Sequence, residues 1–224
     1  MKKKAVIFDM DGVIFDSESL VLDCWEKIGG KYHIPDIRKV FIDCIGTNKE
    51  LTEQIVYSYY GKDFAYDKFS RESSVSYHEY VDKNGLPVKK GTRELLLYLR
   101  EMTIPVGLAS STRLAIVEEE LQQAGIYEYF QVVMGGDQLK RSKPEPDIYL
   151  MTCEKMGVSP ADAYAIEDSY NGIRSAYSAG MIPIMVPDIL PATEEMQEKS
   201  HIVLNNLTEV MAYFQRENCL IEKS

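Results

Sequence analysis

Near its start the chain carries the stretch Ala5-Val6-Ile7-Phe8-Asp9-Met10-Asp11-Gly12, in which an apolar run leads directly into two carboxylates. A continuous apolar run rich in β-branched side chains is typical of a strand buried on both faces of a parallel sheet. Gly12 allows a sharp turn after that strand. We therefore expect a buried strand over residues 4–8 whose end presents Asp9 and Asp11. Carboxylates in such a place can attack as nucleophiles, move protons or bind a hard cation.

Past residue 86 the apolar residues alternate between short continuous runs and a spacing of three or four. This alternation predicts an α/β fold with a doubly wound, mainly parallel sheet. The expected strands, the last of them an edge strand, cover residues 104–109, 131–134, 163–166, 182–186 and 201–204.

Residues 16–86 show only the helical spacing. The apolar positions that define two of the expected helix faces are Leu20, Val21, Cys24, Trp25 and Ile28, and then Leu51, Ile55, Val56, Tyr59 and Tyr60. A third, polar helix is expected from about residue 66 to residue 83. We therefore expect a helical domain at 16–86, inserted into a core domain made of 1–15 and 87–224.

In an open α/β sheet the ligand site lies at the carboxyl ends of the strands. The residues that follow the expected strands are an acid pair, hydroxyls, a lysine and a second acid pair: Asp9 and Asp11, Ser110 and Ser111, Lys143, and Glu167 and Asp168. Carboxylates alone repel a phosphate dianion, so a divalent cation has to offset them, and Mg²⁺ prefers such oxygen ligands. Ser110 can donate a hydrogen bond to a phosphoryl oxygen, and Lys143 can supply positive charge to it.

Four motifs in this order resemble the haloacid dehalogenase superfamily. They are Asp9-Met10-Asp11-Gly12, Ser110, Lys143-Pro144 and Glu167-Asp168. The longer segment Ile166-Glu167-Asp168-Ser169, followed by Asn171-Gly172-Ile173, is similar to the branch that contains β-phosphoglucomutase and sugar-phosphate phosphatases. The resemblance covers essentially the whole chain, and it identifies the insert as a cap domain that closes over substrate.

The resemblance implies a Mg²⁺-dependent phosphatase of small phosphorylated metabolites, with sugar phosphates as the expected class. It implies that Asp9 forms an aspartyl-phosphate and that Asp11 is the general acid and base. The implied metal set is Asp9, Asp11 through its main chain, Asp168 and Glu167, with Glu167 either a direct ligand or a group that supports the ligands. The implied substrate contacts are Asp9, Asp11, Ser110, Ser111 and Lys143.

The alternative is a hexose-phosphate mutase. β-Phosphoglucomutase carries a histidine in the first cap helix, and the corresponding position here is Val21. The nearest cap histidine, His33, is expected at or beyond the end of that helix. This difference favours transfer of the phosphoryl group to water. Lys49 is either a cap cation that touches substrate or an exposed lysine, and the second is favoured.

Two polar side chains allow more than one interpretation. Thr112 is expected to cap the helix that follows Ser110-Ser111. Asn171 either supports the loop around Asp168 or caps the next helix, and the sequence does not distinguish these roles.

The formal net charge of −10 disfavours nucleic acid and anionic membranes as partners. The four cysteines form no CxxC pair, which indicates free thiols in a reducing cytoplasm. No apolar segment reaches the length of a membrane span or of a secretion signal. The expected partner is therefore a small phosphorylated metabolite in the cytoplasm, and the oligomeric state stays open.

Overall fold

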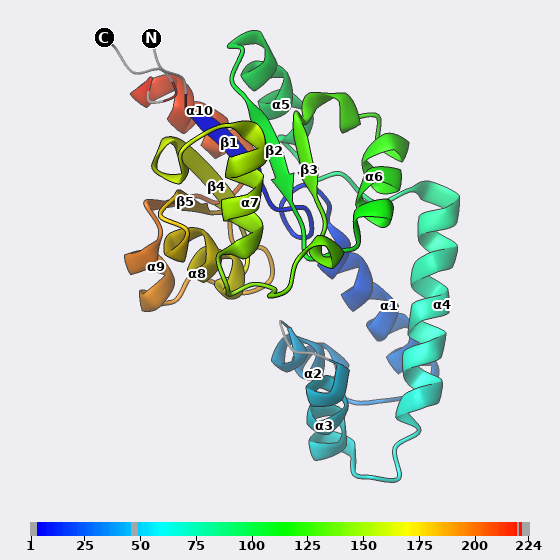
Figure 1. Cartoon of the computed structure of the whole chain (residues 1–224). Coiled ribbons are helices and arrows are strands. Elements are labelled where there is room, and N and C mark those ends of the chain that lie inside the picture. Colours follow the sequence, from blue (N-terminus) through cyan, green and yellow to red (C-terminus); the bar gives the residue numbers. More distant parts are fainter. Residues whose placement is uncertain (1–3, 46–48, 219, 221–224) are drawn as a thin grey trace. The chain divides into compact units, whose positions relative to one another are not determined.

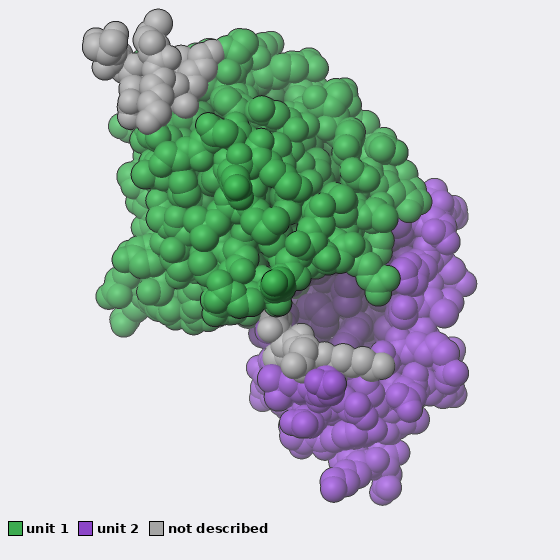
Figure 2. Space-filling view, viewed as in Figure 1, with its two compact units in different colours: residues 1–16, 87–224 green, residues 17–86 purple. Residues whose placement is uncertain are grey.

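The structure is a computed structural model that describes residues 4–45, 49–218 and 220. The chain divides into two compact units (Figure 2). We call residues 1–16 with 87–224 the core unit, and residues 17–86 the helical unit.

The core unit is built on a six-stranded sheet whose neighbouring strands are all parallel (Figure 1). The strand order is β3-β2-β1-β4-β5-β6. The strands are β1 (Ala5–Phe8), β2 (Val106–Ala109), β3 (Val132–Met134), β4 (Ala163–Glu167), β5 (Ile182–Met185) and β6 (Ile202–Val203). This confirms the doubly wound α/β fold, with β1 in the middle of the sheet and β6 at its edge.

One face of the sheet packs against α7 (Asp147–Met156) and α8 (Tyr170–Ser178). Ala5 and Ile7 of β1 point to this face, and their register partners on β4 are Ala163 and Ala165. Small side chains on β4 leave room for the helices. Two bulky α7 residues that fill this layer are Tyr149 and Met156.

The opposite face receives the alternate residues of the same strands. Phe8 meets Phe130 edge-on with ring centroids 6.3 Å apart, and Tyr164 meets Phe214 of α10 (Leu207–Glu217) at 5.1 Å. Helix α10 packs beside α5 (Thr92–Glu101). Because both faces of β1 are covered, all four of its residues are fully buried, as the continuous apolar run predicts.

Three further helices complete the core unit. Helix α6 (Leu114–Gln123) follows β2, α9 (Glu194–Lys199) follows β5, and α10 follows β6. The spacing of apolar residues predicts α5, α6, α7 and α8. We did not predict α9 or α10.

All the helices described in the helical unit pack around aromatic side chains. They are α1 (Ser17–Lys31), α2 (Ile37–Cys44), α3 (Lys49–Tyr60) and α4 (Tyr66–Asn84). Trp25 of α1 lies edge-on to Phe41 of α2 at 5.3 Å and to Phe69 of α4 at 5.1 Å. The spacing of apolar residues predicts α1 and α3, and α4 matches the expected polar helix. The side chain of Lys49 lies outside the described residues.

Among the described residues, no helix combines the length and the hydrophobicity that a membrane crossing requires. Cys24, Cys44 and Cys153 are buried free thiols, as expected, and Cys219 lies outside the described residues. Burial raises the pKa of Cys44 and of Cys153 to about 11.

Candidate active site

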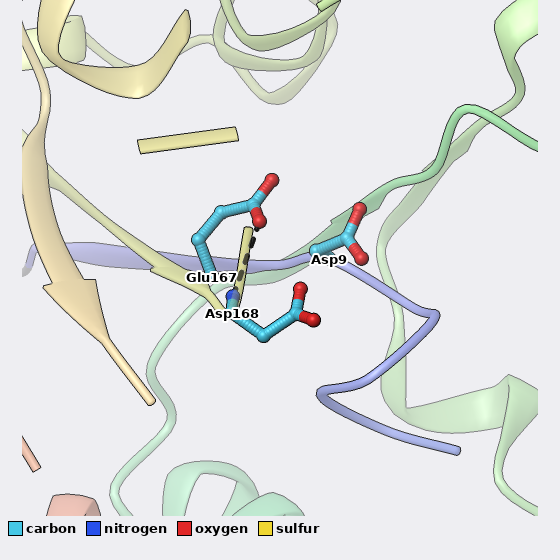
Figure 3. A group of neighbouring side chains, drawn as sticks. All are labelled: Asp9, Glu167 and Asp168. Atoms are coloured by element: carbon cyan, nitrogen blue, oxygen red, sulfur yellow. Dashed lines mark hydrogen bonds between the residues drawn. The ribbon is translucent and has the colours of Figure 1, made fainter. Parts of the chain in front are cut away.

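Three acids meet at the carboxyl ends of β1 and β4 (Figure 3). Asp9 follows β1, Glu167 ends β4 and Asp168 comes next. Each contributes a carboxylate oxygen to a group whose members lie within 4.8 Å of one another. Because β1 and β4 are adjacent and parallel, their ends bring together residues that are more than 150 positions apart in the sequence. Asp9 donates its backbone N–H to Ile166 at 2.9 Å, which fixes this alignment.

Lys143 lies among these acids, with its side chain only 6% exposed. Its Nζ donates to Asp9 Oδ1, to Glu167 Oε1 at 2.6 Å and to the backbone oxygen of Ala109 at 3.0 Å. A lysine ammonium has three protons to donate, and these three acceptors use all of them. The lysine is therefore fixed in position, and it bridges the ends of β1, β2 and β4.

Glu167 is fully buried and accepts hydrogen bonds on both oxygens. Its Oε1 accepts from Lys143 and from the Tyr149 hydroxyl at 2.8 Å. Its Oε2 accepts from the backbone N–H of Asp168 at 3.2 Å, and from the Ser169 N–H and hydroxyl at 3.3 and 3.1 Å. A buried carboxylate requires such compensation. Glu167 thereby orients both the lysine and the loop that carries Asp168.

The charges in this cluster shift one another's protonation. Burial raises the pKa of the Asp9 carboxyl well above its usual range; Lys143 opposes this shift, and Glu167 and Asp11 add to it. Burial alone would lower the pKa of Lys143, but Asp9 and Glu167 outweigh that effect and hold it above its ordinary value. Lys143 is therefore a permanent cation, and Asp9 needs further positive charge to stay ionised.

Two glycines allow the acids to approach the backbone closely. A Cβ atom on Gly12, whose φ is +76°, would lie 2.1 Å from Asp168 Oδ2. A Cβ atom on Gly172 would lie 1.9 Å from the Glu167 carboxyl. No real Cβ tolerates such contacts, so any larger residue at either position would displace an acid.

Thr112 contacts the second acid of the first motif. Its hydroxyl Oγ1 donates to Asp11 Oδ2 at 3.0 Å, and its backbone N–H donates to Ser110 Oγ at 3.0 Å. The expectation that Thr112 caps α6 is wrong, because Arg113 occupies the N-cap position without a side-chain hydrogen bond. Thr112 orients the half-buried Asp11 instead. The sequence shows Thr112 as a third hydroxyl residue after β2, but only the structure shows that its partner is Asp11.

The remaining predicted residues lie at the same edge of the sheet. Ser110 is fully buried directly after β2, and its hydroxyl accepts one hydrogen bond while keeping its own proton to donate. Ser111 is exposed. Neither role considered for Asn171 is supported: Ser169 caps α8 by accepting from Gly172 N–H, and Asn171 Oδ1 accepts from Arg174.

Tyr149 is a further part of the site that the sequence did not reveal. It is fully buried on α7, its hydroxyl donates to Glu167, and Lys143 Nζ lies 5.0 Å from its ring centroid. Burial raises the pKa of Tyr149 well above its usual range, and Glu167 adds to the shift, so the hydroxyl stays a donor. A tyrosine on an otherwise apolar helix face gave only a weak signal for this role.

The donor set suits a hard divalent cation. All three clustered groups are carboxylates, and their charge exceeds the single positive charge of Lys143. Mg²⁺ prefers oxygen ligands from one or two carboxylates together with substrate oxygens and water. Both oxygens of Glu167 already accept hydrogen bonds from protein groups, so Asp9 and Asp168 are better placed for direct coordination.

The fold and these acids at the strand ends define a hydrolase of the doubly wound α/β class. The sequence family described as haloacid dehalogenase-like hydrolase matches residues 6–186. The chain therefore belongs to the haloacid dehalogenase-like hydrolase family, as its four motifs predict.

Relatives and solved structures agree with this assignment. The chain is 30% identical to the phosphorylated carbohydrates phosphatase of Thermotoga maritima, over 80% of this chain and 82% of that protein. It is 32% identical to the β-phosphoglucomutase of Bacillus subtilis, over 82% and 83% of the two chains. The crystal structure of a family hydrolase from Deinococcus radiodurans R1, which holds phosphate and sodium, shares the fold with a TM-score of 0.82 and 22% identity over 99% of both chains.

Proposed function

We propose that this chain is a Mg²⁺-dependent phosphatase that hydrolyses small phosphorylated metabolites, with sugar and polyol phosphates as its substrate class. The observation that carries the proposal is the pairing of Asp9 with the buried Lys143, beside Asp168 and two residues before Asp11. Relatives named as a phosphorylated carbohydrates phosphatase and a β-phosphoglucomutase support phosphate esters as the substrate class.

In the first step the Asp9 carboxylate attacks phosphorus. The bond from phosphorus to the ester oxygen breaks as the bond to Asp9 forms, and Asp11 gives its proton to the departing alcohol oxygen. In the second step a water oxygen attacks the aspartyl-phosphate while Asp11 takes the water proton. The acyl phosphate bond breaks, Asp9 is regenerated, and the net products are an alcohol and inorganic phosphate.

The chain's own groups hold the reactants during these steps. Lys143 stabilises the ionised Asp9 and offsets charge on the phosphoryl oxygens, to which Ser110 donates a hydrogen bond. Thr112 orients Asp11, and Glu167 orients Lys143 with help from Tyr149. Asp9, Asp168 and the Asp11 main chain would hold Mg²⁺, which would supply positive charge to offset the acids when a phosphate dianion binds.

The direct test is a phosphate-release screen over sugar, polyol and nucleoside phosphates, with Mg²⁺ and with a chelator. We expect release from members of the sugar or polyol group, and we expect the chelator to abolish it. Absence of Mg²⁺-dependent release from every ester tested would overturn the proposal.

The mutase is the second candidate, because the Bacillus subtilis β-phosphoglucomutase is 32% identical. Val21 corresponds to the position where β-phosphoglucomutase carries a cap histidine; it lies half-buried within α1, and His33 lies exposed beyond the end of α1. Incubation with β-glucose 1-phosphate and a bisphosphate activator distinguishes the two. We expect free phosphate, and accumulation of glucose 6-phosphate would establish the mutase instead.

A further inference from the structure

Asp188 is an acid that none of the four motifs includes, yet it lies beside the cluster of acids. Asp188 belongs to the loop after β5. Val186 of this loop donates its backbone N–H to the backbone oxygen of Glu167 at 2.7 Å. One carboxylate oxygen of Asp188 lies within 4.8 Å of a carboxylate oxygen of Asp168. A single water molecule can bridge such a separation.

The two oxygens of Asp188 have different surroundings. Oδ1 forms an ion pair with Lys89, whereas Oδ2 is buried and has no hydrogen-bond partner among the described residues. The whole side chain is only 9% exposed. A buried carboxylate oxygen without a donor costs free energy, so a carboxylate held near Asp168 in this state requires an explanation.

Lys89 is itself held by the backbone of the core unit. Its N–H donates to Ile14 at 2.9 Å, and nearby the Asp16 N–H donates to Pro87 at 2.8 Å. The segment 87–91 is thereby tied to the segment that follows Asp11 and Gly12. Lys89 can therefore keep Asp188 in one orientation.

We propose that Asp188 is a positioning residue for the divalent cation of this site, held in place by Lys89. Its free oxygen accepts a hydrogen bond from the hydration shell of a cation coordinated by Asp168, and its negative charge strengthens cation binding. Groups that orient the hydration shell and the ligands of a metal matter nearly as much as the ligands themselves. This inference rests on the metal dependence in the proposed function.

The test is to titrate the protein with Mn²⁺ as a substitute for Mg²⁺ and to measure free Mn²⁺ from its electron paramagnetic resonance signal. Competition with Mg²⁺ then shows that both ions bind the same site. We expect Asp188→Asn to raise the Mn²⁺ dissociation constant on the order of tenfold. Glu128→Gln removes the same charge at an exposed position of the core unit and should leave the constant unchanged. Thermal unfolding without metal separates a folding defect from a binding defect.

The role of Lys89 has a matched control in its neighbour. Lys89 is half-buried and paired, whereas Lys90 is exposed. In a Lys89→Met background the Asp188 carboxylate is no longer held in place. The fold increase in the Mn²⁺ dissociation constant caused by Asp188→Asn should therefore be less than half of the fold increase seen in the wild type. In a Lys90→Met background the full effect should persist. Equal effects in both backgrounds would remove Lys89 from the proposal.

Failure of this inference differs from failure of the proposed function. If the wild-type chain binds no Mn²⁺, the proposed cofactor is wrong. If the wild type binds Mn²⁺ and Asp188→Asn binds it equally well, the metal dependence stands and Asp188 only anchors its loop. A lower unfolding temperature with an unchanged dissociation constant would have the same meaning.

Discussion

The core unit and the helical unit bury different kinds of side chains. The core unit buries ionisable groups at the ends of its strands: Asp9, Lys143, Glu167 and Asp168. The helical unit buries aromatic rings around Trp25 and keeps ion pairs such as Arg38–Glu26 at its surface. A charge network positions its members through one another, so removing one member disturbs the placement of the others, whereas an apolar core loses stability in proportion to the volume removed. A mutation in the core unit should therefore affect chemistry first, and a mutation in the helical unit should affect folding first.

The largest effect tests the chemistry of the core unit. Asp9→Asn keeps the shape of the side chain but removes the proposed nucleophile, so we expect turnover to fall at least about 10,000-fold, roughly 5 kcal/mol in the activation barrier. The folded state should not suffer, because the variant removes a buried carboxylate whose pKa is raised by burial. Phosphate release and thermal unfolding measured on the same sample check both statements.

Asp67→Asn is the matched control in the helical unit, at an exposed position in the first turn of α4. Its turnover should equal that of the wild type. Asp9→Asn with more than a tenth of wild-type turnover would contradict the assignment of the nucleophile.

Much of the cluster of charged residues could be predicted, because the carboxyl ends of neighbouring parallel strands lie close together in space. Asp9, Lys143, Glu167 and Asp168 each follow a strand or lie in the loop beyond it, and the parallel sheet brings them together. The rule gives no hydrogen-bond partners, so it missed Tyr149. Helix-capping preference wrongly assigned Thr112 to the start of α6, whereas its hydroxyl contacts Asp11.

The two helices that we did not predict, α9 and α10, differ in how clearly their apolar residues follow a helical spacing. In α9, Met196 is the sole buried residue of a six-residue helix, so its sequence lacks a periodic pattern. In α10 the buried residues Leu207, Val210 and Phe214 are spaced by three and four, which is sufficient to indicate a helix that we did not predict. His33 and Asp36, both within the connection between α1 and α2, adopt left-handed backbone conformations that we did not predict.

The second largest effect tests the aromatic centre of the helical unit. Trp25→Ala removes a ring that contacts both Phe41 and Phe69, so we expect a loss of about 3–5 kcal/mol in the free energy of unfolding. Denaturant unfolding followed by circular dichroism measures this loss. Trp25→Phe retains a ring and should lose less than half as much. A loss below about 1 kcal/mol for Trp25→Ala would mean that the ring is not central to the packing of this unit.

The third effect is a pH dependence outside the catalytic cluster. Glu120 of α6 is half-buried, and its Oε2 is buried without a hydrogen-bond partner among the described residues. Burial, and then the nearby Asp11 and Glu119, raise the pKa of Glu120 from 4.5 to about 7. Between these values the folded state keeps a proton that the unfolded state has released. The contribution of Glu120 to stability therefore falls as pH rises from 4.5 to 7 and stays low above pH 7.

Glu120→Gln should remove this pH dependence. After discounting for solvent screening of a half-buried group, we expect the variant to exceed the wild type by roughly 1 kcal/mol at pH 8 and to match it near pH 4.5. Thermal unfolding at both pH values measures the difference. Glu119→Gln removes the same charge from an exposed position of the same helix. Its change in the free energy of unfolding at pH 8 should be less than half of that for Glu120→Gln. A constant offset for Glu120→Gln at both pH values would refute the titration.

The smallest effect tests whether charge in the helical unit is confined to its surface. Arg38 Nε donates to Glu26 Oε1 at 2.7 Å, and the two side chains are 59% and 36% exposed. Water screens such a pair, and ordering two long side chains opposes its formation, so Arg38→Gln should leave the unfolding temperature close to that of the wild type. A double-mutant cycle with Glu26→Gln isolates the pair itself, and raising the salt concentration should shrink the coupling further. A clear coupling energy that resists salt would indicate that this unit also depends on a fixed charge pair, which would weaken the contrast between the two units.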